Sequence, residues 1–404
     1  MKRWKKVLLV LLGIIILSQL PFAYRRYRLG RLHDAILNLQ SQRVTDQTQN
    51  AYTDYRGVIH VHSMLGGHST GNFTDIIRAA NQNALSFVVM TEHPAKELDT
   101  ALMTLNGMHE GVLFIGGSEI SAANGDRLLL IPGNGAANAN GTASTQEIIS
   151  QEKSRGGISL AAYPQEFKSW DASDYDGIEV YNLFTNSKKI NPLVTFFDGL
   201  WSYRSYPALL FATFYERPNE NLKKWDELTS ASGRKLVATA GNDAHANVGL
   251  FLGTEDGKRL VGIKLDPYER SFQTVRTHLL IEKDKQLSAL TLLEALRTGH
   301  CYISFDLFSD PTGFYFKAEN GSEQKMMGDE INLAGGVHLT ATTPLKTRIA
   351  LIKDGQTVQE AQDTTRLEFN ATQKGVYRIE AYLDQLSKPA NGKLWIISNP
   401  IYVR

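Results

Sequence analysis

The stretch GVIHVHSMLGGH, residues 57–68, decides the fold and the chemistry expected of this chain. His60 and His62 are one residue apart within an apolar run that predicts a buried strand. Because side chains alternate faces along a strand, both imidazoles are expected to leave it on the same side. The glycine-rich segment that follows ends the strand and brings back a third histidine, His68. The pattern predicts the start of a metal site, to be completed by residues from elsewhere in the chain.

Alternating apolar strands and helices follow this stretch. Near-continuous apolar runs predict strands buried on both faces, and segments of helical periodicity separate several of them. We expect strands at 84–91, 111–117, 128–131, 158–162, 177–181 and 235–240, and helices at 74–83, 98–108 and 145–154. This alternation predicts an α/β fold whose parallel sheet closes, or nearly closes, into a barrel.

Polar groups follow several of these strands at their carboxyl ends. They are Thr-Glu-His at 91–93, Ser-Glu at 118–119, Tyr-Pro at 163–164 and Asp-Ala-His at 243–245. Since functional residues of barrels collect at the carboxyl ends of the strands, we expect these groups beside the first three histidines on one rim. The remaining five of the ten histidines are expected in surface or packing roles: His33, His109, His278, His300 and His338.

The order and spacing of these groups over residues 55–250 resemble the PHP (polymerase and histidinol phosphatase) family, although Thr-Glu-His stands where that family usually has Thr-Asp-His. The resemblance implies a distorted (β/α)7 barrel with a multinuclear metal site. Its implied ligands are His60, His62, Glu119 and Asp243 for one metal, and His68, His93 and His245 for another. Both histidines of the family's third metal are absent: Tyr163 replaces one, and residues 125–128 contain none. Two divalent metals are therefore expected.

The donor types limit the metal and the reaction. The single cysteine, Cys301, excludes an intramolecular disulfide and a thiolate cluster, so nitrogen and carboxylate ligands remain, which suit zinc, manganese or iron. Two metals at one site lower the pKa of a bound water and hold the resulting hydroxide for attack on a phosphorus atom. The predicted function is therefore hydrolysis of a phosphorylated small molecule or phosphodiester by a metal-activated hydroxide. Asp243 and His245 are the predicted catalytic residues. The predicted substrate-binding residues are Tyr163, Arg127 and Arg217, with Lys168 as a further candidate cation.

Two other functions stay open from the sequence. A metal-binding domain that has lost catalysis fits the missing third-metal histidines. A nuclease ranks lower, because 43 Lys and Arg residues balance 42 Asp and Glu residues and no basic, aromatic-interleaved patch stands out.

The amino terminus differs in composition from the rest. Basic residues flank an apolar run at 7–17 that continues to residue 23, which is typical of a signal anchor or a signal peptide. We favour an uncleaved anchor within residues 1–30, since Pro21–Phe22–Ala23 offers only one small residue to a signal peptidase. The orientation stays open, and the commoner outcome places the body outside the cytoplasm, periplasmic or otherwise exported.

The remaining segments complete the expected organisation. Residues 31–54 predict a linker helix and residues 55–300 the hydrolase domain, with an aromatic-rich helical insertion at 185–232 that either shapes the pocket or faces the membrane. Residues 301–404 alternate apolar and polar positions and include a turn at 353–356, which predicts an antiparallel β-sandwich, most simply a packing module.

Overall fold

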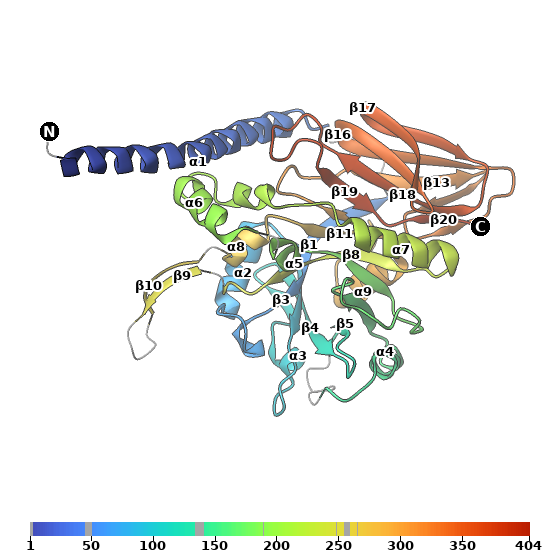
Figure 1. The fold of residues 1–404 in the computed structure, drawn as a ribbon. Helices are drawn as coiled ribbons and strands as arrows, with labels where there is room; N and C mark the ends of the chain where they lie inside the picture. The colour runs from blue at the N-terminus through green and yellow to red at the C-terminus, as the bar shows by residue number, and fades with distance from the viewer. Residues whose placement is uncertain are drawn as a thin grey trace.

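The computed structural model describes residues 3–44, 51–133, 141–188, 190–247, 249–253, 259–264 and 266–404. A long amino-terminal helix runs along one edge of the molecule, and helix α6 (Pro192–Ser202) and the carboxyl-terminal strands lie nearest to it (Figure 1). The first half of the helix extends past the rest of the chain (Figure 1).

Seven strands close into a barrel. They are β1 (Tyr52–Val61), β2 (Phe87–Glu92), β4 (Val112–Ser121), β5 (Arg127–Ile131), β6 (Ile158–Ala162), β7 (Gly177–Asn182) and β8 (Val237–Ala244). Each pairs with the next in this order, and β8 pairs back onto β1. The prediction of a closed barrel is confirmed.

The prediction that the barrel sheet is entirely parallel is wrong. Strand β5 runs antiparallel to both of its neighbours, β4 and β6. Only residues 122–126 connect β4 to β5, and they reverse the chain through a hydrogen bond from the Ala122 amide to the Asp126 carbonyl at 2.8 Å. A parallel partner would need a crossover of about a dozen residues or more. The barrel is therefore mixed.

Helices cover the barrel between strands. They are α2 (Phe73–Gln82), α3 (Thr100–Met103), α4 (Thr145–Ser154), α5 (Leu183–Ser187), α6 (Pro192–Ser202), α7 (Asn219–Ala231), α8 (Tyr268–Ser271) and α9 (Ala289–Thr298), with 3-10 turns η1 (Met64–Gly66) and η2 (Ala208–Thr213). The helix expected at 98–108 is wrong beyond Met103. The chain turns extended at Thr104, and β3 (Gly107–His109) pairs antiparallel with β4. Strands β9 (Gly249–Gly253) and β10 (Arg259–Lys264) form a separate hairpin.

One helix, α1 (Arg3–Ser41), contains the described part of the expected anchor and residues 31–41 of the expected linker, whereas residues 52–54 of that linker begin β1. Its carboxyl-terminal half is fixed to the body by Leu29, Leu32, Ile36 and Leu39, which share one face and are buried. Its amino-terminal half contains a window of mean hydropathy 2.3 with none of its residues buried. By length and composition, this helix can cross a membrane.

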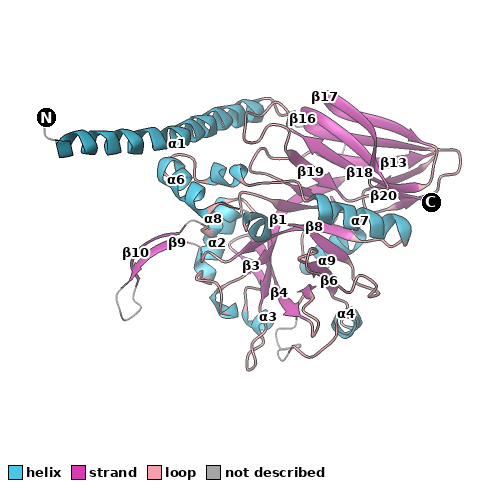
Figure 2. Cartoon of the chain, viewed as in Figure 1, coloured by secondary structure: helices cyan, strands magenta, loops and turns pink. Residues whose placement is uncertain are grey.

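The barrel sheet continues into the carboxyl-terminal strands. The first half of β1 pairs with β11 (Arg276–Glu282), β11 with β12 (Cys301–Ser304), and β12 with β19 (Leu394–Ser398). The other strands are β13 (Tyr315–Asn320), β14 (Glu323–Met326), β15 (Glu330–Ile331), β16 (Val337–Lys353), β17 (Gln356–Ala371), β18 (Gly375–Tyr382) and β20 (Ile401–Val403). Figure 2 shows these strands as a region without helices beside the helix-covered barrel.

The expected hairpin at 353–356 is confirmed. Lys353 pairs with Gln356 across the turn, and Asp354 and Gly355 both have positive φ, 49° and 81°. Two consecutive positive φ angles define a type I′ turn, for which Asp-Gly is a preferred sequence. The hairpin joins β16 to β17. The first half of β16 also pairs with β13, and its second half pairs with β18. Strand β16 therefore connects these two strands within the carboxyl-terminal region.

Apolar side chains fill the barrel interior below the rim. Ile59, Val89, Leu129 and Leu160 belong to one buried cluster, each 0% exposed. These residues close the barrel beneath the carboxyl ends of the parallel strands. The polar residues that follow on β1, β2, β4 and β8 are therefore held over a rigid apolar floor.

Candidate metal centre

A bulge at the end of β1 positions the first two histidines. Ile59 pairs with Val89 and Val61 with Met90, so His60 is an extra residue on β1, and its φ is 69°. Both imidazoles do lie on one side, as expected, because both have Nε2 near Glu119 Oε2. The bulge, and not simple strand alternation, places His60 there. Without the bulge His60 and His62 would share a face; with it, His60 reaches the interior through a left-handed backbone instead. Such a conformation costs about 1–3 kcal/mol and clusters at functional sites.

Tyr163 and Asp243 share this backbone feature, with φ of 48° and 47°. Tyr163 follows β6, and Asp243 lies near the end of β8, where residues pair with β1. Three residues of the rim thus adopt a conformation that L-amino acids rarely use. The surrounding barrel holds them in it.

Four buried side chains converge at the centre of the rim. The Glu119 Oε2 atom lies 3.2 Å from His60 Nε2 and 3.3 Å from His62 Nε2. The Asp243 Oδ1 atom lies 3.5 Å from each of the same two nitrogens. All four residues are buried, and one donor atom from each lies within 4.8 Å of the others. This group matches the ligand set that the resemblance implies for the first metal.

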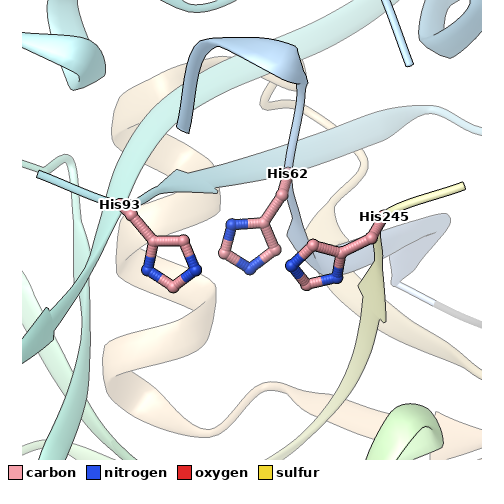
Figure 3. A group of neighbouring side chains, drawn as sticks. All are labelled: His62, His93 and His245. Atoms are coloured by element: carbon pink, nitrogen blue, oxygen red, sulfur yellow. The ribbon is translucent and has the colours of Figure 1, made fainter. Parts of the chain in front are cut away.

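A second group consists of His62, His93 and His245. Figure 3 shows the His62 ring between the other two, with each histidine carried by a different part of the barrel rim. The ring centroids of His93 and His245 lie 4.6 Å and 4.3 Å from that of His62. The His93 Nε2 atom is 3.7 Å from Glu119 Oε2, so this oxygen stands where the two groups meet. We call His60, His62, His93, Glu119, Asp243 and His245 the rim cluster.

His68 lies beside this cluster rather than within it. The resemblance implies that it joins His93 and His245, whereas the structure has His62 in that place. His68 is exposed on the loop after η1, with its ring centroid 5.0 Å from that of His93. His68 is therefore the histidine next to His93 at the outer edge of the rim cluster.

Glu179 and Asn182 complete the surroundings of the cluster, and the sequence reading missed both. Glu179 Oε1 lies 2.5 Å from His60 Nδ1, on the side of the ring away from the cluster. The Asn182 amide nitrogen donates to Glu179 Oε2 at 3.0 Å and to Asp243 Oδ2 at 3.3 Å. A carboxylate that accepts from one ring nitrogen leaves the other with its lone pair toward the site. The available signal was a glutamate inside the otherwise apolar strand β7.

Tyr163 and Arg127 line the rim next to the carboxylates. The Tyr163 hydroxyl donates to Asp243 Oδ2 at 2.6 Å. The Arg127 Nη1 atom donates to Glu119 Oε1 at 2.8 Å, and its guanidinium carbon lies 5.1 Å from the centre of the Tyr163 ring. The Arg127 side chain is 42% exposed. It therefore joins the buried carboxylate to the solvent-facing side of the site.

The structure does not bring the other two candidate cations to the cluster. Arg217 pairs with Glu380 in strand β18. The Lys168 ammonium donates to the Asn124 carbonyl at 2.7 Å, on the loop between β4 and β5. Within the described residues, neither side chain has a recorded contact with the rim cluster.

The electrostatics of the cluster favour bound positive charge. Burial raises the pKa of Glu119 and of Asp243, but His60 and His62 outweigh it, and both pKa values end below their usual range. Burial lowers the pKa of His60, yet Glu179 and Asp243 raise it well above its usual value. Burial lowers the pKa of His93 and of His245 to about 4, and the neighbouring histidines act in the same direction. The inner carboxylates are thus ionised, and the two outer imidazoles are neutral.

Unpartnered buried atoms show that the cluster fits a metal. His62 Nδ1, His62 Nε2 and Asp243 Oδ1 are buried and make no hydrogen bond of acceptable geometry. Such atoms are rare in folded proteins and require an explanation, of which an ion is one. Imidazole and carboxylate donors without sulfur suit zinc, manganese or iron. The residues of the rim cluster therefore fit a divalent cation in both donor type and placement.

Comparisons with known proteins return solved structures only. No family model matches the sequence, and no curated protein matches it. PsfC from Pseudomonas syringae is similar over 63% of this chain and 92% of its own, with 15% identity and a TM-score of 0.39. The lesion-specific endonuclease Q from Pyrococcus furiosus is similar over 61% of this chain and 56% of its own, with 12% identity and a TM-score of 0.37.

A proposed metal-dependent phosphoesterase from Bifidobacterium adolescentis is similar over 47% of this chain and 87% of its own, with 14% identity and a TM-score of 0.29. These structural neighbours have PHP-type folds, the fold type to which the sequence motifs point. Every one of these TM-scores is below 0.5, so the rim cluster, and not these neighbours, is the basis for assigning a function.

Proposed function

We propose that this protein is a metal-dependent hydrolase that acts on a phosphoester. The observation that carries the proposal is the convergence of four buried donor residues, with His62 and Asp243 retaining unpartnered atoms at their centre. Divalent ions held there would lower the pKa of water and neutralise charge on phosphoryl oxygens.

The rim cluster is proposed to hold two divalent ions of zinc, manganese or iron. His60, His62, Glu119 and Asp243 would hold one ion. His93 and His245 would hold the other, and His68, beside His93, is the residue that can replace His62 on that side. Glu119 Oε2, which faces histidines of both groups, would be shared.

Asp243 and His245 are proposed as the catalytic residues. Two hydrogen bonds, from Tyr163 and Asn182, fix Asp243 Oδ2. The other oxygen, Oδ1, makes no hydrogen bond and faces the cluster, so it is placed to accept the proton of an attacking water. His245 Nδ1 lies 2.9 Å from the Asp243 carbonyl oxygen, which orients its other nitrogen away from the backbone.

Arg127 is proposed to bind the phosphoryl group, with Tyr163 beneath it. One guanidinium nitrogen donates to Glu119, and the half-exposed remainder of the group keeps donors toward the solvent side. A planar guanidinium matches the geometry of phosphate oxygens. Tyr163 supports this position through its ring, and burial together with nearby carboxylates raises its pKa far above the usual value, so that it acts as a donor and not as a phenolate.

The test is hydrolysis by the detergent-solubilised full chain, loaded in turn with zinc, manganese or iron(II). The substrates are a generic aryl phosphomonoester and an aryl phosphodiester. Asp243→Asn keeps the size of the side chain and removes the base, and is expected to lower kcat by about 10²–10⁴-fold. His338→Ala, on the distant strand β16, serves as the matched histidine control and should leave kcat unchanged. Full activity in Asp243→Asn would contradict the proposed role of this residue.

A second candidate function is metal binding without catalysis. The ion pair between Arg127 and Glu119 favours it, because it occupies a carboxylate oxygen next to the position where the family places further ligands. This alternative predicts that the wild-type chain binds metal and hydrolyses neither substrate. The same assay therefore separates the two functions.

We also propose that α1 anchors the protein in a membrane with the body on the exported side. The support is the length and hydropathy of the exposed half of α1. Residues 1–30 would form the anchor, 31–54 the linker, 55–300 the hydrolase domain and 301–404 a packing module. Protease accessibility of the body in intact spheroplasts tests the orientation.

A further inference from the structure

Helix α6 presents an apolar face that the described residues leave uncovered. Leu193, Phe196 and Leu200 are 67%, 51% and 69% exposed. They lie three and four residues apart, so they point to one side of the helix. A group of large, exposed apolar side chains is more often a contact surface than the same side chains scattered over the protein.

The adjacent face of α6 is fixed to α1. The ring centroids of Phe197 and Phe22 are 4.8 Å apart, and Asp198, with a side chain only 5% exposed, accepts from Arg25 Nε at 2.6 Å. The Trp201 indole donates to Gln19 at 3.1 Å. These contacts hold α6 against residues 19–25 of α1, directly after the apolar segment.

The part of α1 that precedes these contacts is the segment able to cross a membrane. It extends past the body, and α6 is the element that lies beside α1 at the point where this extension begins (Figure 1). If that segment enters a bilayer, α6 is held at the bilayer surface. The apolar face of α6 is then at the depth where headgroups meet acyl chains.

Charged and aromatic residues around this position match an anionic surface. Tyr24 and Tyr27 are 61% and 60% exposed on α1, and tyrosines collect at the membrane interface. Arg28, Lys188 and Arg204 add positive charge on α1 and on both sides of α6. Basic residues at this depth are attracted to anionic lipids.

We infer that the face formed by Leu193, Phe196 and Leu200 is a membrane-contact surface whose occupant is the anionic phospholipid bilayer entered by α1. The body is thereby held by two points, α1 and α6. Helix α5, the helix that precedes α6 in the sequence, lies beside the rim cluster, since the Phe184 ring centroid lies 6.2 Å from that of His245. Contact through α6 therefore sets the rim of the barrel close to the lipid headgroups.

The test places an environment-sensitive fluorophore on α6 of the full chain. Cys301 is fully buried, so single-cysteine labelling at Phe196→Cys or Leu200→Cys is practical. Val358→Cys, on strand β17, gives a label of similar exposure far along the chain as the control. Each labelled protein is reconstituted in phosphatidylcholine vesicles with or without phosphatidylglycerol, with a quencher attached either to the lipid or dissolved as iodide.

We expect lipid-attached quencher to reduce emission from positions 196 and 200 at least about two-fold more than from position 358, and iodide to do the reverse, most strongly with phosphatidylglycerol present. Adding Leu193→Ser and Leu200→Ser should weaken lipid quenching at 196 while metal content stays unchanged. Equal quenching at 196 and 358 would overturn the inference. So would protection of position 196 that depends on protein concentration in detergent, because a second copy of the chain would then cover α6.

Discussion

Two buried assemblies of histidine and carboxylate lie in this protein, and they are built differently. The rim cluster gathers its side chains from the ends of four barrel strands. The second assembly, which we call the His278 network, consists of His278, Asp54, Asp306, Arg276 and Tyr302 where β1 leaves the barrel to pair with β11. Both combine ionised carboxylates with imidazole in the protein interior.

Every side chain of the His278 network finds a partner. His278 Nδ1 lies 2.8 Å from Asp54 Oδ1, and its Nε2 lies 3.2 Å from Asp306 Oδ1. Tyr302 donates to Asp54 at 2.5 Å, and Arg276 to Asp306 at 3.0 Å. None of its side-chain polar atoms is among the unpartnered buried atoms of the described residues. His278 lies in the regular strand β11, where it is paired with Arg56 on β1 and with Tyr302 on β12.

The difference separates a structural assembly from a functional one. The His278 network satisfies its own charges, so it needs nothing further to be stable. The rim cluster keeps unpartnered atoms on His62 and Asp243, and two of its residues, His60 and Asp243, have positive φ, as does the adjacent Tyr163. Unsatisfied polar atoms and backbone strain both cost stability, and a protein retains them where a ligand compensates. The predictions below test this separation.

The largest effect is expected from breaking the His278 network. His278→Ala leaves Asp54 and Asp306 buried without their common partner and should lower the free energy of unfolding by about 3–5 kcal/mol. Denaturant unfolding in detergent measures this change. His338→Ala, at a half-exposed site, should change it by less than about 0.5 kcal/mol. Because the network is structural, folded His278→Ala protein should retain the wild-type metal content; loss of metal would blur the distinction between the two assemblies.

The pH dependence of stability should report on the same network. Burial lowers the pKa of His278, but Asp54 and Asp306 outweigh it and raise the pKa to about 10. The folded state therefore binds this proton more tightly than the unfolded state does. Its stabilisation is fully present below pH ~6.5 and is lost as the pH rises toward 10, an effect on the order of a few kcal/mol. Unfolding curves at pH 7 and pH 9.5 should differ much less in His278→Ala than in wild type; equal differences would contradict the assignment.

A smaller effect is expected from Glu179, which orients His60. Glu179→Gln keeps the shape but weakens the hydrogen bond that fixes His60 Nδ1, and should reduce metal affinity by about 10–100-fold. Competition with a chromogenic chelator measures the affinity. Glu152→Gln is the control, a buried carboxylate near α4 with no recorded contact to the rim cluster among the described residues. Wild-type affinity in Glu179→Gln would remove this residue from the functional assembly.

The smallest effect is expected from Arg127. Arg127→Lys keeps the charge toward Glu119 but loses the planar fork, and should raise the KM for a phosphomonoester by about ten-fold while metal content stays unchanged. Arg217→Lys, at a guanidinium that pairs with Glu380, is the control and should leave KM unchanged. A fall in kcat without a change in KM would show that Arg127 acts on the reaction step and not on binding.

Much of the barrel could be read from the sequence because buried strands are continuous apolar runs. The limits of β6 and the region of β7 follow from such runs directly. The antiparallel direction of β5 was missed, because the strands expected at 111–117 and 128–131 leave ten residues between them, whereas only residues 122–126 connect β4 to β5 in the structure. The helix expected through Met108 ends at Met103, because Asn106–Gly107 is a turn sequence and Gly107 has a φ of 81°.

The site could be anticipated in composition but not in geometry. The motifs bring His60, His62, Glu119 and Asp243 together as the resemblance implies. The bulge at His60 leaves no trace in residue type, and the place of His62 between His93 and His245 depends on it. Glu179 is distant in sequence from every motif, and only folding brings it to His60. The alternating residues at 375–382 predict strand β18, but its contact with Arg217 joins residues 163 positions apart, and only the folded chain reveals it.

The most direct test of the central claim is the metal content of the full chain and of His62→Ala, by elemental analysis after dialysis against metal-free buffer. His62 is a proposed ligand of the first ion, and His68 replaces it beside the second, so the account predicts about two divalent ions per chain in wild type and loss of the first ion in His62→Ala, with His278→Ala retaining both. Wild-type protein that binds no divalent ion, or His62→Ala that keeps both, would contradict a metal centre at the rim cluster.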